Sequence, residues 1–212
     1  MSDEQANTLT HGLGLVLSLA AVPFLIALAV IHGDTWHVVS CSVYGTTLVA
    51  LYAASTSYHF ALSRGARWGH ILRIVDHACI YLLIAGSYTP FALVMLQGDW
   101  GWTIFGIVWG LAALGITFKV FWTGQFELVS TATYLLMGWG ALIAFQPVME
   151  IFPGACLAWV LAGGISYTLG TVFYLFDRKP FMHAAWHLAV LAGSACHYVA
   201  VIGYVLPAEI WA

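Results

Sequence analysis

The chain has 212 residues, of which 62% are hydrophobic and only 7% are charged, and its mean hydropathy is +0.91. A soluble domain carries about 25% charged residues, so this composition excludes a water-exposed globular protein. Six Lys or Arg against nine Asp or Glu give a formal net charge of -3. No basic run is present that could neutralise phosphates, which excludes a nucleic-acid-binding protein.

Seven stretches without Asp, Glu, Lys or Arg follow one another along the chain, each long enough for the roughly 20 residues that a membrane-spanning helix needs. All are rich in Leu, Ile, Val, Ala, Phe and Trp, and none shows the alternation of a barrel strand. The sequence therefore predicts an all-α membrane protein, with residues 1–212 forming a single seven-helix transmembrane domain. In chain order the stretches are 5–33, 35–63, 77–98, 100–118, 128–149, 151–176 and 180–208.

The basic residues set the expected orientation. They fall in three connections that face the same side, and the connections on the other side carry no Lys or Arg. By the positive-inside rule we expect the basic side to be cytoplasmic, the N-terminus inside and the C-terminus outside, in the plasma (inner) membrane. The basic residues are Arg64, Arg67 and Arg73 between the second and third stretches, Lys119 after the fourth, and Arg178 and Lys179 between the sixth and seventh.

The last helix, expected to start at Pro180, carries His183 and His187 near its cytoplasmic end. Residues four apart share one face of a helix, so both imidazoles can reach one metal ion. The alternative is that the two histidines only hydrogen-bond to neighbouring helices. The pair by itself does not decide between these interpretations.

Further ionisable groups lie at the same depth on two other helices, and an ionisable group inside a spanning helix indicates function. His59 lies near the end of the second stretch, with Ser55 one turn deeper on the same face, and the third helix rises from the same side through Arg73 and Asp76. His59, Asp76 and the histidine pair all fall within about two turns, roughly 10 Å, of one boundary. We therefore expect them to form one layer near the cytoplasmic surface.

Three imidazoles with an open fourth position are typical of catalytic zinc, whereas structural zinc is usually closed by four protein ligands. The layer therefore predicts a Zn2+ ion held by His59, His183 and His187. Asp76 would then offset part of the metal charge, hydrogen-bond to a bound water and accept its proton. The alternative role for Asp76 is to pair with Arg73, three residues earlier on the same helix.

The remaining histidines are expected to be structural. His197 lies ten residues beyond His187, roughly 15 Å along the helix, so a buried hydrogen bond to another helix is its expected role. His77 points about 100° away from Asp76 on an ideal helix. The others, His11, His32, His37 and His70, fall at predicted membrane interfaces.

Four groups of residues together resemble the haemolysin III branch of the progestin and adipoQ receptor (PAQR) family, which is related to the adiponectin receptors and, more distantly, the alkaline ceramidases. The resemblance covers nearly the whole chain and implies seven helices with the N-terminus inside. It also implies that His59, His183 and His187 hold zinc, while Asp76 and Ser55 contact the zinc-bound water or the reacting group. The four groups are Asn7-x-x-Thr10-His11-Gly12, Ser55-x-x-x-His59, Asp76-His77 with Ile80-Tyr81 and Gly86-Ser87-Tyr88-Thr89-Pro90, and His183-x-x-x-His187.

Two hypotheses for function remain from the sequence. The first is a zinc-dependent hydrolase acting on amide or ester bonds of membrane lipids, with Asp76 as base and Ser55 donating to the developing oxyanion. The second is a non-catalytic membrane protein, either a sensor of lipid composition or a pore-forming haemolysin, in which zinc only holds helices together. Membrane-lipid homeostasis is compatible with both, and membrane lipids are the only partners that the sequence suggests.

Overall fold

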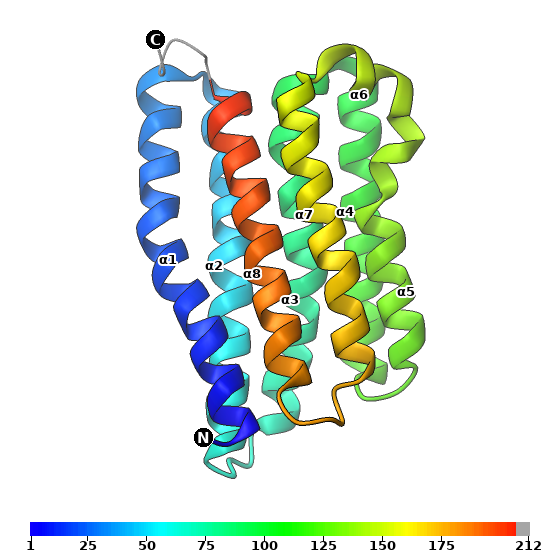
Figure 1. Ribbon diagram of the computed structural model, residues 1–212. Helices are drawn as coiled ribbons and strands as arrows, with labels where there is room; N and C mark the ends of the chain where they lie inside the picture. The colour runs from blue at the N-terminus through cyan, green and yellow to red at the C-terminus, as the bar shows by residue number, and fades with distance from the viewer. Residues whose placement is uncertain (207–212) are drawn as a thin grey trace.

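The computed structural model describes residues 1–206, which form helices packed side by side (Figure 1). No strand occurs among these described residues, and this confirms the predicted all-α fold. The C-terminus, predicted to face the outer side, lies outside the described residues. In chain order the elements are α1 (Asp3–His32), α2 (Thr35–Ser63), α3 (Gly69–Pro90), the π-helical η1 (Phe91–Leu96), α4 (Gly98–Trp122), α5 (Glu127–Gly138), the 3-10 helix η2 (Gly140–Ala144), α6 (Phe145–Ile151), α7 (Gly154–Leu175), α8 (Met182–Ala200) and the π-helical η3 (Val201–Val205).

Seven helical segments in the described part of the chain are long and apolar enough to cross a membrane, which confirms the predicted number. The third combines α3 with η1, the fifth combines α5, η2 and α6, and the seventh combines α8 with η3. The third segment begins at Gly69, well before the charge-free stretch 77–98. Its charged residues are accommodated because Arg73 and Asp76 find polar partners inside the bundle.

The fifth segment is broken, although the sequence predicted one uninterrupted stretch over 128–149. α5 ends at Gly138, and a 3-10 helix leads into the short α6. Backbone groups freed by such a break need new partners inside a membrane protein. The hydroxyl of Tyr88 supplies them: it donates to the Gly138 carbonyl at 2.7 Å and accepts from the Ala141 N–H at 3.1 Å.

The start of the last helix also differs from the prediction. α8 begins at Met182, and the residue before it, Phe181, has a left-handed backbone conformation with φ 61°. A left-handed residue cannot belong to a right-handed helix. Pro180 therefore lies in the turn between α7 and α8 and is not the first residue of the helix.

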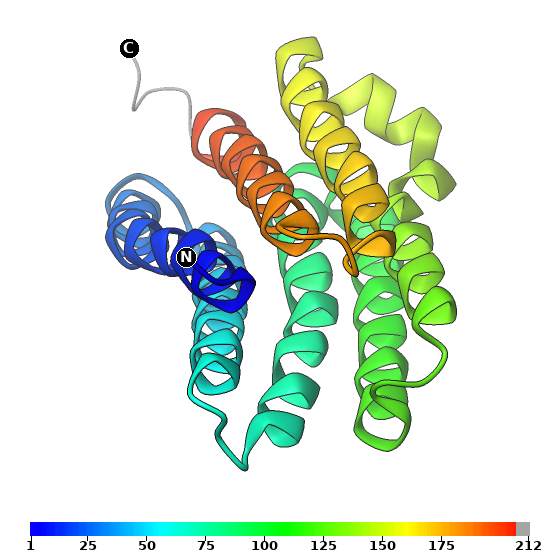
Figure 2. The same ribbon diagram turned by 60° about the horizontal axis from the view of Figure 1, so that its bottom comes forward.

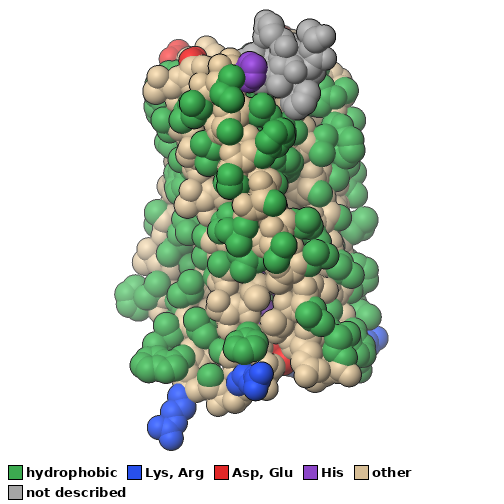
Figure 3. Space-filling model, turned by 90° about the vertical axis from the view of Figure 1, so that its left-hand side faces the viewer, with side chains coloured by type: hydrophobic (Ala, Val, Ile, Leu, Met, Phe, Trp, Pro, Cys, Tyr) green, Lys and Arg blue, Asp and Glu red, His purple; other side chains and the backbone are tan. Residues whose placement is uncertain are grey.

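The predicted basic connections gather at one end of the bundle, which we call the basic end. The α2–α3, α4–α5 and α7–α8 connections lie at the same end as the N-terminus (Figure 1), and Lys and Arg side chains appear at this end in Figure 3. The side of the membrane that this end faces remains a prediction from the positive-inside rule.

A group of charged side chains joins four helices near the basic end. Glu127, the first residue of α5, accepts hydrogen bonds from Arg73 of α3 and Lys119 of α4, each at 3.1 Å. The hydroxyl of Tyr174 on α7 donates to the same carboxylate, also at 3.1 Å. Lys119 is completely buried, and the partly exposed carboxylate of Glu127 is its charge partner.

The helix α1 packs against both α2 and α8, as the view from the basic end shows (Figure 2). Its approach to α2 requires a glycine at position 14, because a Cβ atom there would lie 2.5 Å from the ring of Tyr52. This close approach brings the first turns of α1 onto the polar layer that the sequence predicted on α2 and α8.

Candidate metal centre

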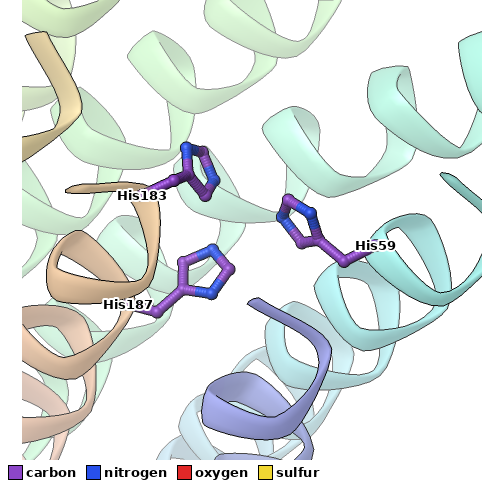
Figure 4. Close-up of side chains that lie close together, drawn as sticks. All are labelled: His59, His183 and His187. Atoms are coloured by element: carbon purple, nitrogen blue, oxygen red, sulfur yellow. The ribbon is translucent and has the colours of Figure 1, made fainter. Parts of the chain in front are cut away.

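The structure brings together the three histidines that the sequence selected as metal ligands. His59 comes from the last turns of α2, and His183 and His187 come from the first turns of α8 (Figure 4). One ring nitrogen of each lies within 4.8 Å of the others, and His59 and His187 are only 2% exposed. This buried group could hold a metal ion.

The hydrogen bonds around the rings leave nitrogen atoms free for a metal. His59 Nδ1 lies 2.7 Å from Glu4 Oε2, and its Nε2 is buried without a hydrogen-bond partner among the described residues. His187 Nδ1 lies 3.2 Å from the Asn7 carbonyl oxygen. A carboxylate or a carbonyl only accepts hydrogen bonds, so both Nδ1 atoms carry the proton and both Nε2 atoms present a lone pair.

This arrangement matches what is known of histidine ligands. A metal-bound imidazole usually donates its other N–H to a carboxylate or a carbonyl, which fixes the tautomer and the ring orientation. Glu4 is this partner for His59, and the Asn7 carbonyl is this partner for His187. A second polar atom, Thr10 Oγ1, lies 3.1 Å from His187 Nδ1. The three imidazoles, two of them with outer partners, therefore fit a divalent ion such as Zn2+, whose ligands in open sites are often three histidines.

Asp76 is buried, and its nearest ionisable neighbour is His77, at 3.5 Å between Oδ2 and Nδ1. The alternative partner that the sequence suggested, Arg73, pairs with Glu127 instead. His77 Nδ1 also lies 2.9 Å from the Arg73 carbonyl oxygen. The Asp76 carboxylate is therefore available to a molecule that enters the site.

Ser55 lies deeper in the bundle than His59, as predicted, but its hydroxyl has a partner that the sequence analysis missed. Ser55 Oγ is 2.7 Å from Nδ1 of His11, which is only 3% exposed. The His11 ring stacks on His187 with ring centroids 3.5 Å apart and an interplanar angle of 14°. The sequence analysis gave His11 only a depth near a membrane interface, whereas the structure buries its side chain inside the bundle against the site.

Two hollows of opposite character meet at the histidines. A cavity of about 270 Å³ with mainly apolar walls runs from His11, Ser55, Asp76 and His187 towards Phe152 at the far end of the bundle. A polar pocket of about 180 Å³ lies at the basic end and includes Glu4, His59 and His183 in its wall. The three imidazoles therefore lie between an apolar chamber and a polar opening.

Comparison with known proteins identifies the family of the chain. A sequence model of haemolysin-III-related proteins matches residues 1–198. The chain belongs to this family. It is 44% identical over 204 residues to the hemolysin-3 homolog of Bacillus subtilis, which covers 96% of this chain and 95% of that protein. It is also 44% identical over 207 residues to hemolysin-3 of Bacillus cereus, with 98% and 94% covered.

A more distant similarity reaches animal proteins. The chain is 29% identical over 209 residues to the human monocyte to macrophage differentiation factor, covering 95% of this chain and 84% of that protein. Together with the family match, this confirms the resemblance to the haemolysin III branch of the PAQR family. The chain is an integral, multi-pass membrane protein of that family.

Sequence reasoning missed the contribution of the first helix to the site. Four of its residues contact the metal-ligand layer: Glu4, Asn7, Thr10 and His11. Their spacing of three or four residues places them on one face of a helix. This polar face at the start of an apolar span could have indicated from the sequence that the first helix contributes to the site. The prediction for His197 is confirmed, since its Nε2 lies 3.3 Å from the Val160 carbonyl oxygen of α7.

Proposed function

We propose that this protein is a zinc-dependent hydrolase that cleaves amide or ester bonds of membrane lipids. The observation that carries the proposal is that a group of three imidazoles, two buried and one half-buried, lies beside a buried carboxylate and a hydroxyl at one end of an apolar cavity. Apolar cavities with a few convergent polar groups are typical of small-molecule sites. A lipid offers both parts that this shape accepts, an acyl chain and a polar carbonyl group.

Each residue has a defined task in this proposal. His59, His183 and His187 hold the ion through their free ring nitrogens. When bound, zinc supplies Lewis-acid chemistry, polarising a carbonyl and making water a better nucleophile at neutral pH. Asp76 accepts the proton of the attacking water, and Ser55 donates a hydrogen bond to the oxygen that becomes negatively charged.

The cavity supplies the remaining requirements. Its mainly apolar walls suit an acyl chain, and the polar pocket at the histidine end offers a path for water. The site lies near the basic end of the bundle, which we assign to the cytoplasmic side of the plasma (inner) membrane. A hydrolase at this depth acts on lipids of the cytoplasmic leaflet and contributes to membrane-lipid homeostasis.

The test uses the purified full-length chain in detergent, with bound zinc measured by elemental analysis. Wild type, Asp76→Asn, His187→Ala and the control Asp99→Asn, an exposed carboxylate at the opposite end, are incubated with a panel of lipid amides and esters. Release of fatty acid is measured together with folded yield.

We expect Asp76→Asn to retain zinc and to lose about 100- to 10,000-fold of the rate, the usual effect of removing a general base. His187→Ala should lose the ion itself, since one of three ligands is gone. Asp99→Asn should behave as wild type. If wild type hydrolyses no amide or ester lipid while binding zinc, the ion joins α2 to α8 in a sensor or a pore, and the hydrolase proposal is refuted.

A further inference from the structure

The hydroxyl of Ser55 differs from most buried hydroxyls in this chain in the partner that it uses. Hydroxyls inside a helix commonly donate to a carbonyl three or four residues earlier. Ser18, Thr47 and Thr89 do so, at distances of 2.9 to 3.0 Å. Within the described residues, the only hydrogen-bond partner of Ser55 Oγ is His11 Nδ1. The hydroxyl is therefore oriented by another helix and not by its own.

His11 is held firmly enough to fix the direction of this bond. One face of its ring stacks on His187, and the ring of Tyr52 meets it edge-on with centroids 5.1 Å apart. Gly14 lets α1 approach Tyr52 at this level. Both His11 and Ser55 line the apolar cavity, and His11 Nε2 is buried with no partner among the described residues.

The ring of His11 allows two arrangements of the hydrogen bond. A neutral imidazole has one N–H donor and one acceptor nitrogen, and a serine hydroxyl has a single proton to donate. If Ser55 donates to Nδ1, its proton is occupied and only oxygen lone pairs face the cavity. If Nδ1 carries the proton and donates to Ser55 Oγ, the serine O–H stays free to point into the cavity.

We propose that His11 is a positioning residue that donates its Nδ1–H to Ser55 Oγ and thereby directs the serine O–H towards the substrate carbonyl oxygen. The inference rests on the proposed function, because only this arrangement leaves Ser55 a proton for the developing oxyanion. A hydroxyl that is held in place beforehand loses no rotational freedom when the charge forms, which is the condition for strong electrostatic stabilisation. The substrate is then recognised by its carbonyl group as well as by its acyl chain.

The kinetic arm of the test uses Ser55→Ala, His11→Phe, the double variant and His11→Asn. Phe keeps a flat ring against His187 but has no donor, whereas the Asn amide places an N–H donor close to the position of Nδ1. Hydrolysis of fluorescent N-dodecanoyl-sphingosine in mixed micelles gives kcat and KM, and elemental analysis gives the zinc content. Ser18→Ala, which removes a buried hydroxyl from α1 two turns beyond His11, is the matched control.

Removing one oxyanion donor lowers kcat by about 100- to 1,000-fold. We expect a loss in this range for Ser55→Ala and a loss of at least about tenfold for His11→Phe, with KM and zinc content unchanged. The double variant should be no slower than Ser55→Ala, because residues that act as a unit are not additive. His11→Asn should recover most of the lost kcat. Additive losses, or no recovery with Asn in a folded, zinc-loaded protein, would overturn the proposal.

A second arm does not depend on activity. In protein labelled with the heavy nitrogen isotope at histidine, NMR of the ring nitrogens identifies the protonated atom of His11, whose signals are assigned by their absence in His11→Phe or His11→Asn. A protonated Nδ1 whose signal moves in Ser55→Ala but not in Ser18→Ala supports the assignment. A protonated Nε2 overturns it and makes His11 the acceptor for the serine proton. A wild-type chain without turnover refutes the proposed function, and the NMR result then decides the hydrogen bond separately.

Discussion

Replacing Glu4 with Gln should weaken zinc binding while leaving the bundle intact. The Glu4 carboxylate lies 2.7 Å from His59 Nδ1 and is the outer partner that keeps the proton on that nitrogen. Gln has the same length, and its amide oxygen can still accept the N–H. The negative charge is lost, however, and hydrogen bonds with an ionised partner are roughly twice as strong as neutral ones. The change therefore isolates the effect of the charge on the ligand.

The expected magnitude follows from the exposure of the pair. Removing the outer partner of a histidine ligand typically costs about 10- to 100-fold in metal affinity. His59 is buried, but the Glu4 side chain is 35% exposed, so water screens part of its charge. We therefore expect the lower end of that range, about tenfold, which corresponds to about 1.4 kcal/mol of binding free energy.

The assay is a zinc titration of purified full-length protein against a chelating dye of known affinity. Asp3→Asn is the matched control, because Asp3 lies in the same first turn and lines the same polar pocket. It removes an equal charge, and no histidine among the described residues donates a hydrogen bond to Asp3. If Glu4→Gln and Asp3→Asn bind zinc equally well, the Glu4–His59 hydrogen bond has no role in holding the ion.

Three further outcomes are expected. Glu127→Gln should lower the free energy of unfolding in detergent by about 1 to 2 kcal/mol, because Lys119 stays buried without its carboxylate while water already screens part of the Glu127 charge; an effect no larger than that of Glu150→Gln, an exposed carboxylate at the other end, would contradict this. Green fluorescent protein fused after Ser63, at the basic end, should fluoresce because that end is expected in the cytoplasm, and the same fusion after Gly33, at the other end, should not. The reverse pattern would put the basic end outside. A chelator should lower the unfolding temperature of wild type, since a ligand at 100 times its Kd stabilises by about 2.7 kcal/mol; identical melting curves would mean that no metal was bound.

The positions of charged residues predicted most of the fold, because placing a charge in lipid is costly enough to mark where each span ends. The same reasoning placed His59, His183 and His187 at one depth, and the structure brings them together. Depth along the membrane normal is readable from sequence. The break after Gly138 was not, because it depends on Tyr88 of another helix to satisfy the freed backbone groups.

The rotation of each helix about its own axis is harder to infer than its depth. His11 was assigned to an interface because it lies near the start of the first apolar stretch, and the sequence does not reveal which neighbour its face meets. The close approach of Gly14 on α1 to Tyr52 on α2 determines which residues His11 contacts. Ser55 was selected correctly as a site residue, but its partner depends on the same packing between α1 and α2.

The division of the site between the first two helices and the last one has a consequence for how the protein is made. During synthesis α1 and α2 reach the membrane first and can pair at once, which brings Glu4 to His59 and His11 to Ser55. At that stage the nascent chain has one ligand of three. The other two arrive only with α8, the last span to be translated, which also packs against α1. A full ligand set forms only in the assembled bundle, so an ion that needs all three histidines could be held only after α8 has packed against α1 and α2.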